Sequence, residues 1–272
     1  MKKILLAMST LLGILSCGNQ KTEIERSQFT HEELMLAVAP KSHSIKKIGI
    51  LVYDGVNSLD VFGPRYVLGQ IMGVDMILIA LKSGNVKTVK GVEFVPNTTI
   101  SQVDSLDILV VPGGFKGTLE VAYNPEVQEW IRKVDKTTTY TASVCTGGWI
   151  LGSTGLLKGK RATTNWYDAE KMLAKYGAEF SNERFTNDGK YWTSAGVTAG
   201  MDMSLALLAE IAGRSYAQGV MLDMEYDPTP PFEGGSPEST PSEILQFMTL
   251  MYKAGIDPVL TRMENGKTHI VD

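Results

Sequence analysis

Cys145 is the residue in this sequence whose type and setting could do the most chemistry. It follows residues 139–144, a run rich in β-branched residues that predicts a strand, and it precedes an apolar stretch with helical spacing at 149–157. A cysteine at such a turn lies on a nucleophile elbow, where Gly147 and Gly148 keep the crowded backbone free of side chains. The helix N-terminus would favour the thiolate. We therefore predict that Cys145 is a nucleophile with a lowered pKa; the alternative is a buried structural cysteine.

Histidine is scarce, which limits the chemistry available to Cys145. The three histidines, His31, His43 and His269, all lie outside the region expected to form the core. A Cys–His pair needs an imidazole within hydrogen-bond reach of the sulfur, so thiol protease and glutaminase mechanisms are disfavoured. One core cysteine also leaves too few soft ligands for zinc, and no glycine-rich nucleotide-binding motif is present. We therefore expect no metal and no cofactor.

The groups that transfer protons must then be carboxylates, hydroxyls or water. Asp60 follows the first predicted strand and is the candidate proton carrier, although it could instead complement a helix dipole. Thr146 follows the nucleophile and could hydrogen-bond a substrate, or it could be only a polar residue in the first helical turn. Asp54, next to a glycine, is interpreted as a turn residue, and Asp202 as a helix cap.

Two glycines could supply backbone donors to the same site. Gly113 and Gly114 follow the strand predicted at 106–111 and can bring N–H groups towards an anion, or they can simply form a tight turn. In sheets of parallel strands the active site lies at the carboxyl ends of the strands. Asp54, Gly113 and Cys145 all fall at such ends, so we expect them to converge in space.

The elements that must position these residues alternate between strand and helix from about 46 to 257. Strands are predicted at 47–53, 75–81, 106–111 and 139–144, with hairpins at 86–100 and 180–192. Helices are predicted at 57–72 (starting late because of Pro64), 121–134, 149–157, 167–176, 201–212 and 243–253. This alternation predicts a three-layer α/β sandwich with a mainly parallel sheet. About 210 residues suffice for one domain with a sizeable core.

The N-terminus has the features of an exported lipoprotein. Two lysines precede an apolar stretch at 4–15 that is too short to span a bilayer. The stretch ends in Ile14-Leu-Ser-Cys17, which resembles a bacterial lipobox and implies cleavage before Cys17 and lipidation of that residue. A plain signal peptide is the alternative. Gly18 at the next position favours the outer membrane, and we expect the protein to face the periplasm or the exterior of the cell.

The expected organisation is a signal peptide at 1–16, a lipidated polar tether at 17–45, a domain at 46–257 and a tail at 258–272, with a short helix near residues 31–36 of the tether. Removing the signal peptide takes away two lysines, which leaves 24 basic and 30 acidic residues and a net charge of −6. Such a charge gives no reason to expect nucleic-acid binding. Cys145 is then the only free thiol of the mature protein, so no internal disulfide can form.

Several segments taken together resemble the DJ-1/PfpI superfamily. They are Ser143-Val-Cys-Thr-Gly147, residues 151–164 with Trp166, Gly196-Val-Thr-Ala-Gly200, residues 54–64 and residues 107–114. The resemblance covers roughly 46–252 and extends to the sensor halves of AraC-type regulators. Residues 225–237 resemble the isonitrile-hydrating branch of the superfamily in particular.

This resemblance implies a flavodoxin-like fold, a homodimer and an active site of Cys145, Thr146 and Asp60. It also implies a small-molecule substrate, for which the candidate binding residues are Gly113, Gly114, Gly147 and Val197. The implied reaction adds water to an isonitrile and releases an N-substituted formamide, without a cofactor and through a thioimidate on Cys145.

Two departures bear on this expectation. Asn165 stands where the family often has histidine, and the lipoprotein signal differs from intracellular relatives. Another cysteine-dependent activity of the superfamily, of amidase, glyoxalase or deglycase type, and a non-catalytic sensor or binding lipoprotein remain open as alternatives.

Overall fold

The computed structural model describes residues 29–266, so Cys17, the expected signal peptide and the end of the expected tail lie outside the described residues. The chain divides into one compact unit that ends at Ala37 and another that begins at Val38. The first contains most of helix α1 (His31–Val38), the short helix expected in the tether. Thr30 begins it with a capping box, in which its hydroxyl accepts the Glu33 N–H and Glu33 accepts the Thr30 N–H. No helix within 29–266 is long and apolar enough to cross a membrane.

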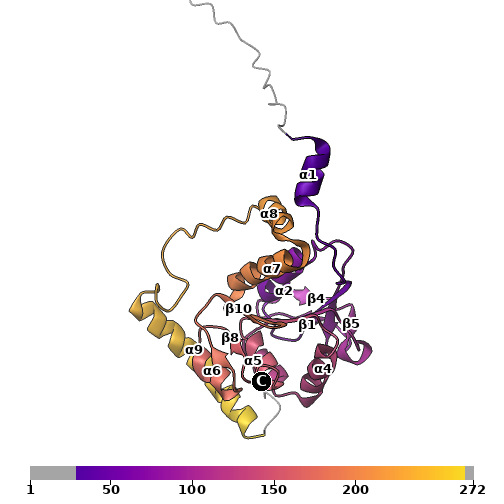
Figure 1. Cartoon of the computed structure of the whole chain (residues 1–272). Helices are drawn as coiled ribbons and strands as arrows, with labels where there is room; N and C mark the ends of the chain where they lie inside the picture. The colour runs from indigo at the N-terminus through magenta and orange to yellow at the C-terminus, as the bar shows by residue number, and fades with distance from the viewer. Residues whose placement is uncertain (1–28, 267–272) are drawn as a thin grey trace, which may run out of the picture. The chain divides into compact units, whose positions relative to one another are not determined.

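The second unit is built on a seven-stranded sheet (Figure 1). In spatial order its strands are β10 (Phe185–Asp188), β11 (Tyr191–Ser194), β7 (Tyr140–Val144), β6 (Ile108–Val111), β1 (Lys47–Val52), β2 (Asp75–Ala80) and β5 (Thr98–Thr99). Every neighbouring pair is parallel except β10 and β11, which form the hairpin expected there. The central strands β1 and β6 are apolar along almost their whole length because both faces of the sheet are covered.

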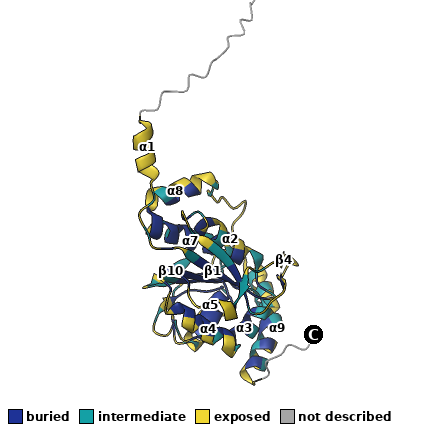
Figure 2. Ribbon diagram, turned by 90° about the vertical axis from the view of Figure 1, so that its right-hand side faces the viewer, coloured by how far each residue is buried: buried dark blue, intermediate teal, exposed yellow. Residues whose placement is uncertain are grey.

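Helices cover both faces of this sheet, as Figure 2 shows. Packed together on one face are α2 (Ser58–Leu68), α7 (Val197–Ala212) and α8 (Arg214–Asp223). On the other lie α3 (Lys116–Ala122), α4 (Pro125–Asp135), α5 (Gly147–Ser153), α6 (Ala169–Lys175) and α9 (Ser242–Glu264). Small pairs β3 (Val86–Lys87) with β4 (Glu93–Phe94) and β8 (Arg161–Ala162) with β9 (Glu179–Phe180), and the 3-10 helix η1 (Ile100–Gln102), complete the fold. The expected three-layer α/β sandwich is confirmed.

Helix α2 corrects the expected effect of Pro64. The helix begins at Ser58, because Asn57 caps it by accepting the Leu59 N–H, and it continues through the proline. Proline removes one hydrogen bond from a helix interior. Here the buried face of the helix, which includes Val61 and Val67, compensates for that loss. The expectation of a late start was therefore wrong.

Other boundaries moved for similarly local reasons. The helix expected at 121–134 is α4, which begins only at Pro125 because Asn124 caps it there, and a separate helix that was not expected, α3, precedes it. Helix α7 begins at Val197 instead of 201. The helix expected at 243–253 is α9, which continues to Glu264, so the domain boundary expected at 257 falls inside a helix.

Candidate active site

Cys145 occupies the turn between β7 and α5 in a strained conformation. Its φ is 58°, in the left-handed region that non-glycine residues rarely adopt. The surrounding backbone holds it there: its N–H donates to the carbonyl oxygens of Ser194 at 3.1 Å and Ala195 at 2.7 Å. Its own carbonyl accepts the Thr164 hydroxyl at 2.7 Å. Strain of this kind is typical of nucleophile elbows, and the strand–turn–helix context expected for Cys145 is confirmed.

Glycines allow the segments around the elbow to approach one another. A Cβ on Gly147 would lie 2.0 Å from the carbonyl oxygen of Val111, and a Cβ on Gly113 would lie 2.6 Å from the backbone nitrogen of Thr146. Contacts below about 3 Å with backbone atoms cannot be relieved by rotating a side chain. The end of β6 therefore packs directly against the start of α5, which brings the two strand ends together as expected.

Asp60 is completely buried beside the cysteine. One of its oxygens, Oδ2, accepts the Gly113 N–H at 3.1 Å, and Oδ1 receives no N–H or O–H donor. The carboxyl group and the Cys145 thiol lie close enough for each to influence the pKa of the other. Burial raises the pKa of Asp60 to about 7, although the hydrogen bond from Gly113 and the proximity of the Cys145 thiol oppose this rise. A carboxyl group with this pKa can both accept and donate a proton near neutral pH.

The electrostatics of Cys145 differ from the expectation of a lowered pKa. The residue is 6% exposed, and burial, followed by the negative charge of Asp60, raises the pKa of its thiol far above the ordinary value. The Thr146 N–H and the Asn165 amide lower it, but not enough to compensate. The prediction of a readily formed thiolate in the free protein was therefore wrong. A nucleophilic role for this sulfur would require it to lose its proton during the reaction, and the adjacent carboxyl group is that of Asp60.

Asn165, which was noted only as a departure from the family pattern, contacts the reactive sulfur. Its Nδ2 donates to Cys145 Sγ at 3.5 Å, and its Oδ1 accepts the Tyr167 N–H at 3.1 Å. The side chain is buried, so its orientation is fixed. No pattern near Asn165 in the sequence indicated this contact, which joins residues 20 positions apart.

The Thr146 hydroxyl is held by the protein itself. It accepts the Gly114 N–H at 2.9 Å and shares a hydrogen bond with the Thr118 hydroxyl at 3.0 Å. The Thr118 hydroxyl in turn lies 3.1 Å from that of Tyr53. Sequence reasoning missed Thr118 and Tyr53, because hydroxyls on a helix and at a strand end carry no distinctive spacing.

This network also changes the interpretation of two glycine amides. The Gly113 N–H donates to Asp60 and the Gly114 N–H donates to Thr146, so neither is free to bind an anion in this structure. The expectation that they present donors to a substrate was wrong in that respect. They hold the carboxyl group and the hydroxyl beside the sulfur instead.

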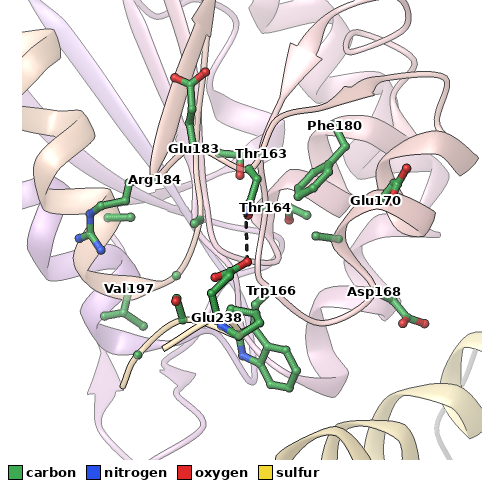
Figure 3. A pocket seen from close by; sticks show the side chains of 18 of the residues that line it. Thr163, Thr164, Trp166, Asp168, Glu170, Phe180, Glu183, Arg184, Val197 and Glu238 are labelled. Carbon is green, nitrogen blue, oxygen red and sulfur yellow. Dashed lines mark hydrogen bonds between the residues drawn. The ribbon is translucent and has the colours of Figure 1, made fainter. Parts of the chain in front are cut away.

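A cavity of about 740 Å³ lies beside this buried cluster (Figure 3). Val197, a candidate substrate-binding residue, lines it together with Thr164 and Trp166. Residues 235–238, from the chain between α8 and α9, line it from another side, where Glu238 accepts the Asn182 amide at 3.2 Å. Cys145, Asp60 and Thr146 do not line the cavity. Thr164 connects the cavity with the buried cluster, because it lines the cavity and its hydroxyl donates to the Cys145 carbonyl.

Two further aspartates lie outside the cluster. Asp54 is an exposed turn residue, as interpreted, and its Oδ1 accepts the Lys87 N–H at 2.9 Å. Asp202 does not cap α7: it lies within the helix, where it forms an ion pair with Arg184 and accepts the Tyr226 hydroxyl. Within residues 29–266 no group of three or more His, Cys, Asp or Glu side chains is arranged to hold a metal ion.

Comparisons with known proteins agree with this arrangement. Isonitrile hydratase from Pseudomonas putida is 38% identical over 199 residues, which cover 73% of this chain and 86% of that protein. The transcriptional regulator CdhR from Pseudomonas aeruginosa is 35% identical over 112 residues, covering 41% of this chain and 33% of the regulator. The crystal structure of a ThiJ/PfpI family protein from Pseudomonas syringae superposes with a TM-score of 0.76 at 33% identity, covering 84% of this chain and 92% of the other.

Drosophila melanogaster DJ-1beta has the same fold, with a TM-score of 0.61 at 23% identity over 66% of this chain and 98% of its own. The model of the DJ-1/PfpI family matches residues 46–210, which include the elbow, Asp60 and Asn165. The chain therefore belongs to the DJ-1/PfpI family.

Proposed function

We propose that this protein hydrates an isonitrile to an N-substituted formamide. The observation that carries the proposal is the buried pair formed by Cys145 and Asp60, whose carboxyl pKa is about 7. An isonitrile is neutral and compact, and its hydration needs a nucleophile and a proton carrier but no imidazole. The similarity to P. putida isonitrile hydratase, which extends over most of both chains, supports the same reaction.

In the first half of the reaction, Cys145 attacks the terminal carbon of R–N≡C. Because burial keeps the thiol protonated, Asp60 removes the S–H proton as the carbon–sulfur bond forms. Asp60 then delivers that proton to the same carbon. The product is a neutral thioimidate, R–N=CH–S–, whose sulfur is that of Cys145. No charge has to persist in the buried site, where an isolated charge would be costly.

In the second half, water adds to the thioimidate carbon. Asp60 takes a proton from the attacking water and passes it to the imine nitrogen. The tetrahedral adduct then collapses: the carbonyl forms, the carbon–sulfur bond breaks, and the hydroxyl proton returns through Asp60 to the sulfur. The sum of both halves is one isonitrile plus one water giving one formamide, with the free thiol restored. We assign Thr146 the role of supporting this site, because its hydroxyl fixes the Gly114 segment next to the sulfur.

The test is product analysis with a simple alkyl isonitrile. We expect loss of the isonitrile infrared band and formation of one equivalent of the N-alkyl formamide, both absent with Cys145→Ala. Trapping with labelled substrate should add the mass of the isonitrile to the peptide that contains Cys145. Tight binding of the isonitrile without turnover would overturn the proposal and favour a sensor, the role suggested by the similarity to part of CdhR.

We also propose that the protein is lipid-anchored through Cys17 in the bacterial envelope, most simply at the outer membrane, and that it acts as a homodimer. The basic residues before the apolar stretch at 4–15, and the sequence Ile14-Leu-Ser-Cys17, support the anchor. The resemblance to the family supports the dimer. Neither property alters the chemistry proposed for Cys145, because the tether is separate in sequence from the residues of the site.

A further inference from the structure

Tyr252 belongs to the C-terminal helix α9, outside the region matched by the family model. Its ring packs against three other aromatic side chains. The centroid distances are 5.0 Å to Trp166, 5.2 Å to Tyr167 and 5.4 Å to Phe115. Trp166 and Tyr167 directly follow Asn165, whose amide contacts the sulfur. The aromatic cluster therefore joins α9 to the segment that carries this amide.

Several contacts fix α9 in this position. Tyr167 donates its hydroxyl to Asp257 Oδ1 at 2.9 Å, and Lys175 of α6 pairs with Glu264, so α6 and α9 lie side by side (Figure 1). Gly255 allows close approach, because a Cβ there would lie 2.4 Å from the Phe115 ring. One turn from Tyr252, Ile256 is buried. The part of the helix that carries Tyr252 is thus held by packing, an ion pair and a hydrogen bond.

The phenol of Tyr252 lies near the Asn165 side chain, close enough for the amide to influence its pKa. The amide of Asn165 accepts the Tyr167 N–H at Oδ1 and donates from Nδ2 to Cys145 Sγ, and the Tyr252 phenol lies beside the same amide. Burial, followed by the proximity of the ionisable groups of Cys145 and Asp60, raises the pKa of Tyr252, so the phenol stays protonated beside them. A side-chain amide in a broad torsional well gains rigidity from each additional partner.

We propose that Tyr252 is a positioning residue of the cysteine site, which acts through Asn165. By holding the plane of the amide, it keeps an N–H directed at Cys145 Sγ while negative charge develops on the sulfur. A hydrogen bond to an ionised group is stronger than one to a neutral group, so the gain is largest as the thiolate forms. The inference rests on the proposed role of Cys145 as the nucleophile, and it makes α9 a part of the site.

Tyr252→Phe tests this inference, because it keeps the aromatic packing and removes only the hydroxyl. We expect iodoacetamide to modify Cys145 about 3- to 10-fold more slowly than in the wild type at every pH at which the protein stays folded. Mass spectrometry of the peptide containing Cys145 in the full chain gives this rate without any isonitrile. With substrate, kcat should fall by a similar factor while KM stays within about twofold. Tyr140→Phe, which removes a half-buried phenol at the opposite end of β7, is the control and should change neither measurement.

An unchanged alkylation profile in Tyr252→Phe would overturn the inference. So would a lowered kcat with an unchanged profile, because the phenol would then act on the substrate and not through Asn165. Asp257→Ala removes the acceptor of the Tyr167 hydroxyl. In the double variant with Tyr252→Phe, we expect Cys145 to be alkylated no more slowly than in Tyr252→Phe alone. Fully additive slowing would contradict the idea that both residues act through Asn165. Since alkylation needs no isonitrile, a failure of the proposed hydratase activity would leave this test intact.

Discussion

At the scale of single residues, the backbone geometry at Cys145 suits a nucleophile, whereas its electrostatic surroundings disfavour the thiolate. The backbone holds it at the strained elbow, φ 58°, where a nucleophile is normally presented. Burial and the Asp60 carboxylate nevertheless keep the thiol protonated. A protonated thiol beside a carboxyl group with a pKa of about 7 is suited to a reaction that begins and ends with neutral species.

Replacing Cys145 with alanine or serine should abolish formamide production. The fold should survive, since the surrounding backbone hydrogen bonds involve the N–H and carbonyl of this residue and not its sulfur. Circular dichroism and a thermal melt would establish folding, and gas chromatography would measure product. Turnover at the wild-type rate in the alanine variant would exclude a covalent thioimidate.

Replacing Asp60 with asparagine should lower kcat by about 10²- to 10⁴-fold, the usual contribution of a general acid–base group. Asparagine keeps the shape of the side chain but cannot carry the proton from sulfur to carbon. The pH–rate profile should also lose the limb near pH 7 that belongs to the raised pKa of Asp60. Asp54→Asn, at an exposed turn, is the matched control and should keep the wild-type profile; if it lost the limb instead, the proton carrier would be Asp54.

The same substitution should change how stability depends on pH. The pKa of Asp60 is 3.8 when unperturbed and about 7 in the folded protein, so between these values the folded state binds the extra proton. The contribution of Asp60 to the free energy of unfolding is therefore fully present below about pH 4 and is lost as the pH rises to about 7. Asp60→Asn should become progressively more stable relative to the wild type from pH 4 to 8 in urea unfolding. A constant difference across that range would show that the carboxyl pKa is not raised.

At the scale of elements, the elbow depends on how closely the end of β6 approaches the start of α5. Gly147 permits that approach, because any Cβ there would meet the Val111 carbonyl oxygen at 2.0 Å. The clash involves backbone on both sides, so relief requires one element to move. Such a movement would also shift the Gly113 and Gly114 segment that holds Asp60 and Thr146.

Gly147→Ala should therefore lower both stability and activity. We expect a loss of about 1–3 kcal/mol in the free energy of unfolding, typical of overpacking a core, measured by denaturant titration. Gly219→Ala is the control: Gly219 lies within α8 with nothing near its Cβ position, and alanine should be neutral or stabilising there. Wild-type stability of Gly147→Ala would contradict the close approach of β6 and α5.

At the scale of the whole molecule, the lipid anchor and the dimer would decide where the protein resides and what it assembles with. Cys17→Ser should release the protein into soluble fractions or leave the signal peptide attached, because the proposed lipid is carried by the Cys17 thiol. Mass spectrometry of the mature N-terminus should find lipid on Cys17 in the wild type. An unmodified terminus at another residue would exclude the anchor.

The domain from 46 to 272 should retain wild-type kcat and KM without the tether, and light scattering should give the mass of a dimer. The residues of the site all lie between Tyr53 and Tyr252, within the second compact unit. A monomer with full activity would separate catalysis from assembly. An inactive domain that is nevertheless folded would show that the tether contributes to the site.

The sequence by itself determined the chemical groups and the order of the elements. The apolar strands, the helical spacing and the elbow around Cys145 are local patterns, and local patterns follow from the periodicity of the backbone. Asp60, which follows the first strand and lies in the first turn of α2, could likewise be selected as the candidate proton carrier before any contact was known. The exact helix limits around Pro64 and Pro125 escaped this reasoning, because a cap and a buried face decided them.

Only the tertiary structure decided the pKa values of these groups and the contacts between them. The raised pKa values of Cys145 and Asp60 come from burial, which depends on every element that excludes water from the site. Two contacts join distant parts of the chain: that of Asn165 with the sulfur, and the packing of Tyr252 of α9 against Trp166. No periodicity encodes such contacts. They exist because strand ends of a parallel sheet meet at one edge and because α9 packs against α3 and the segment after Asn165, which is a property of the folded chain as a whole.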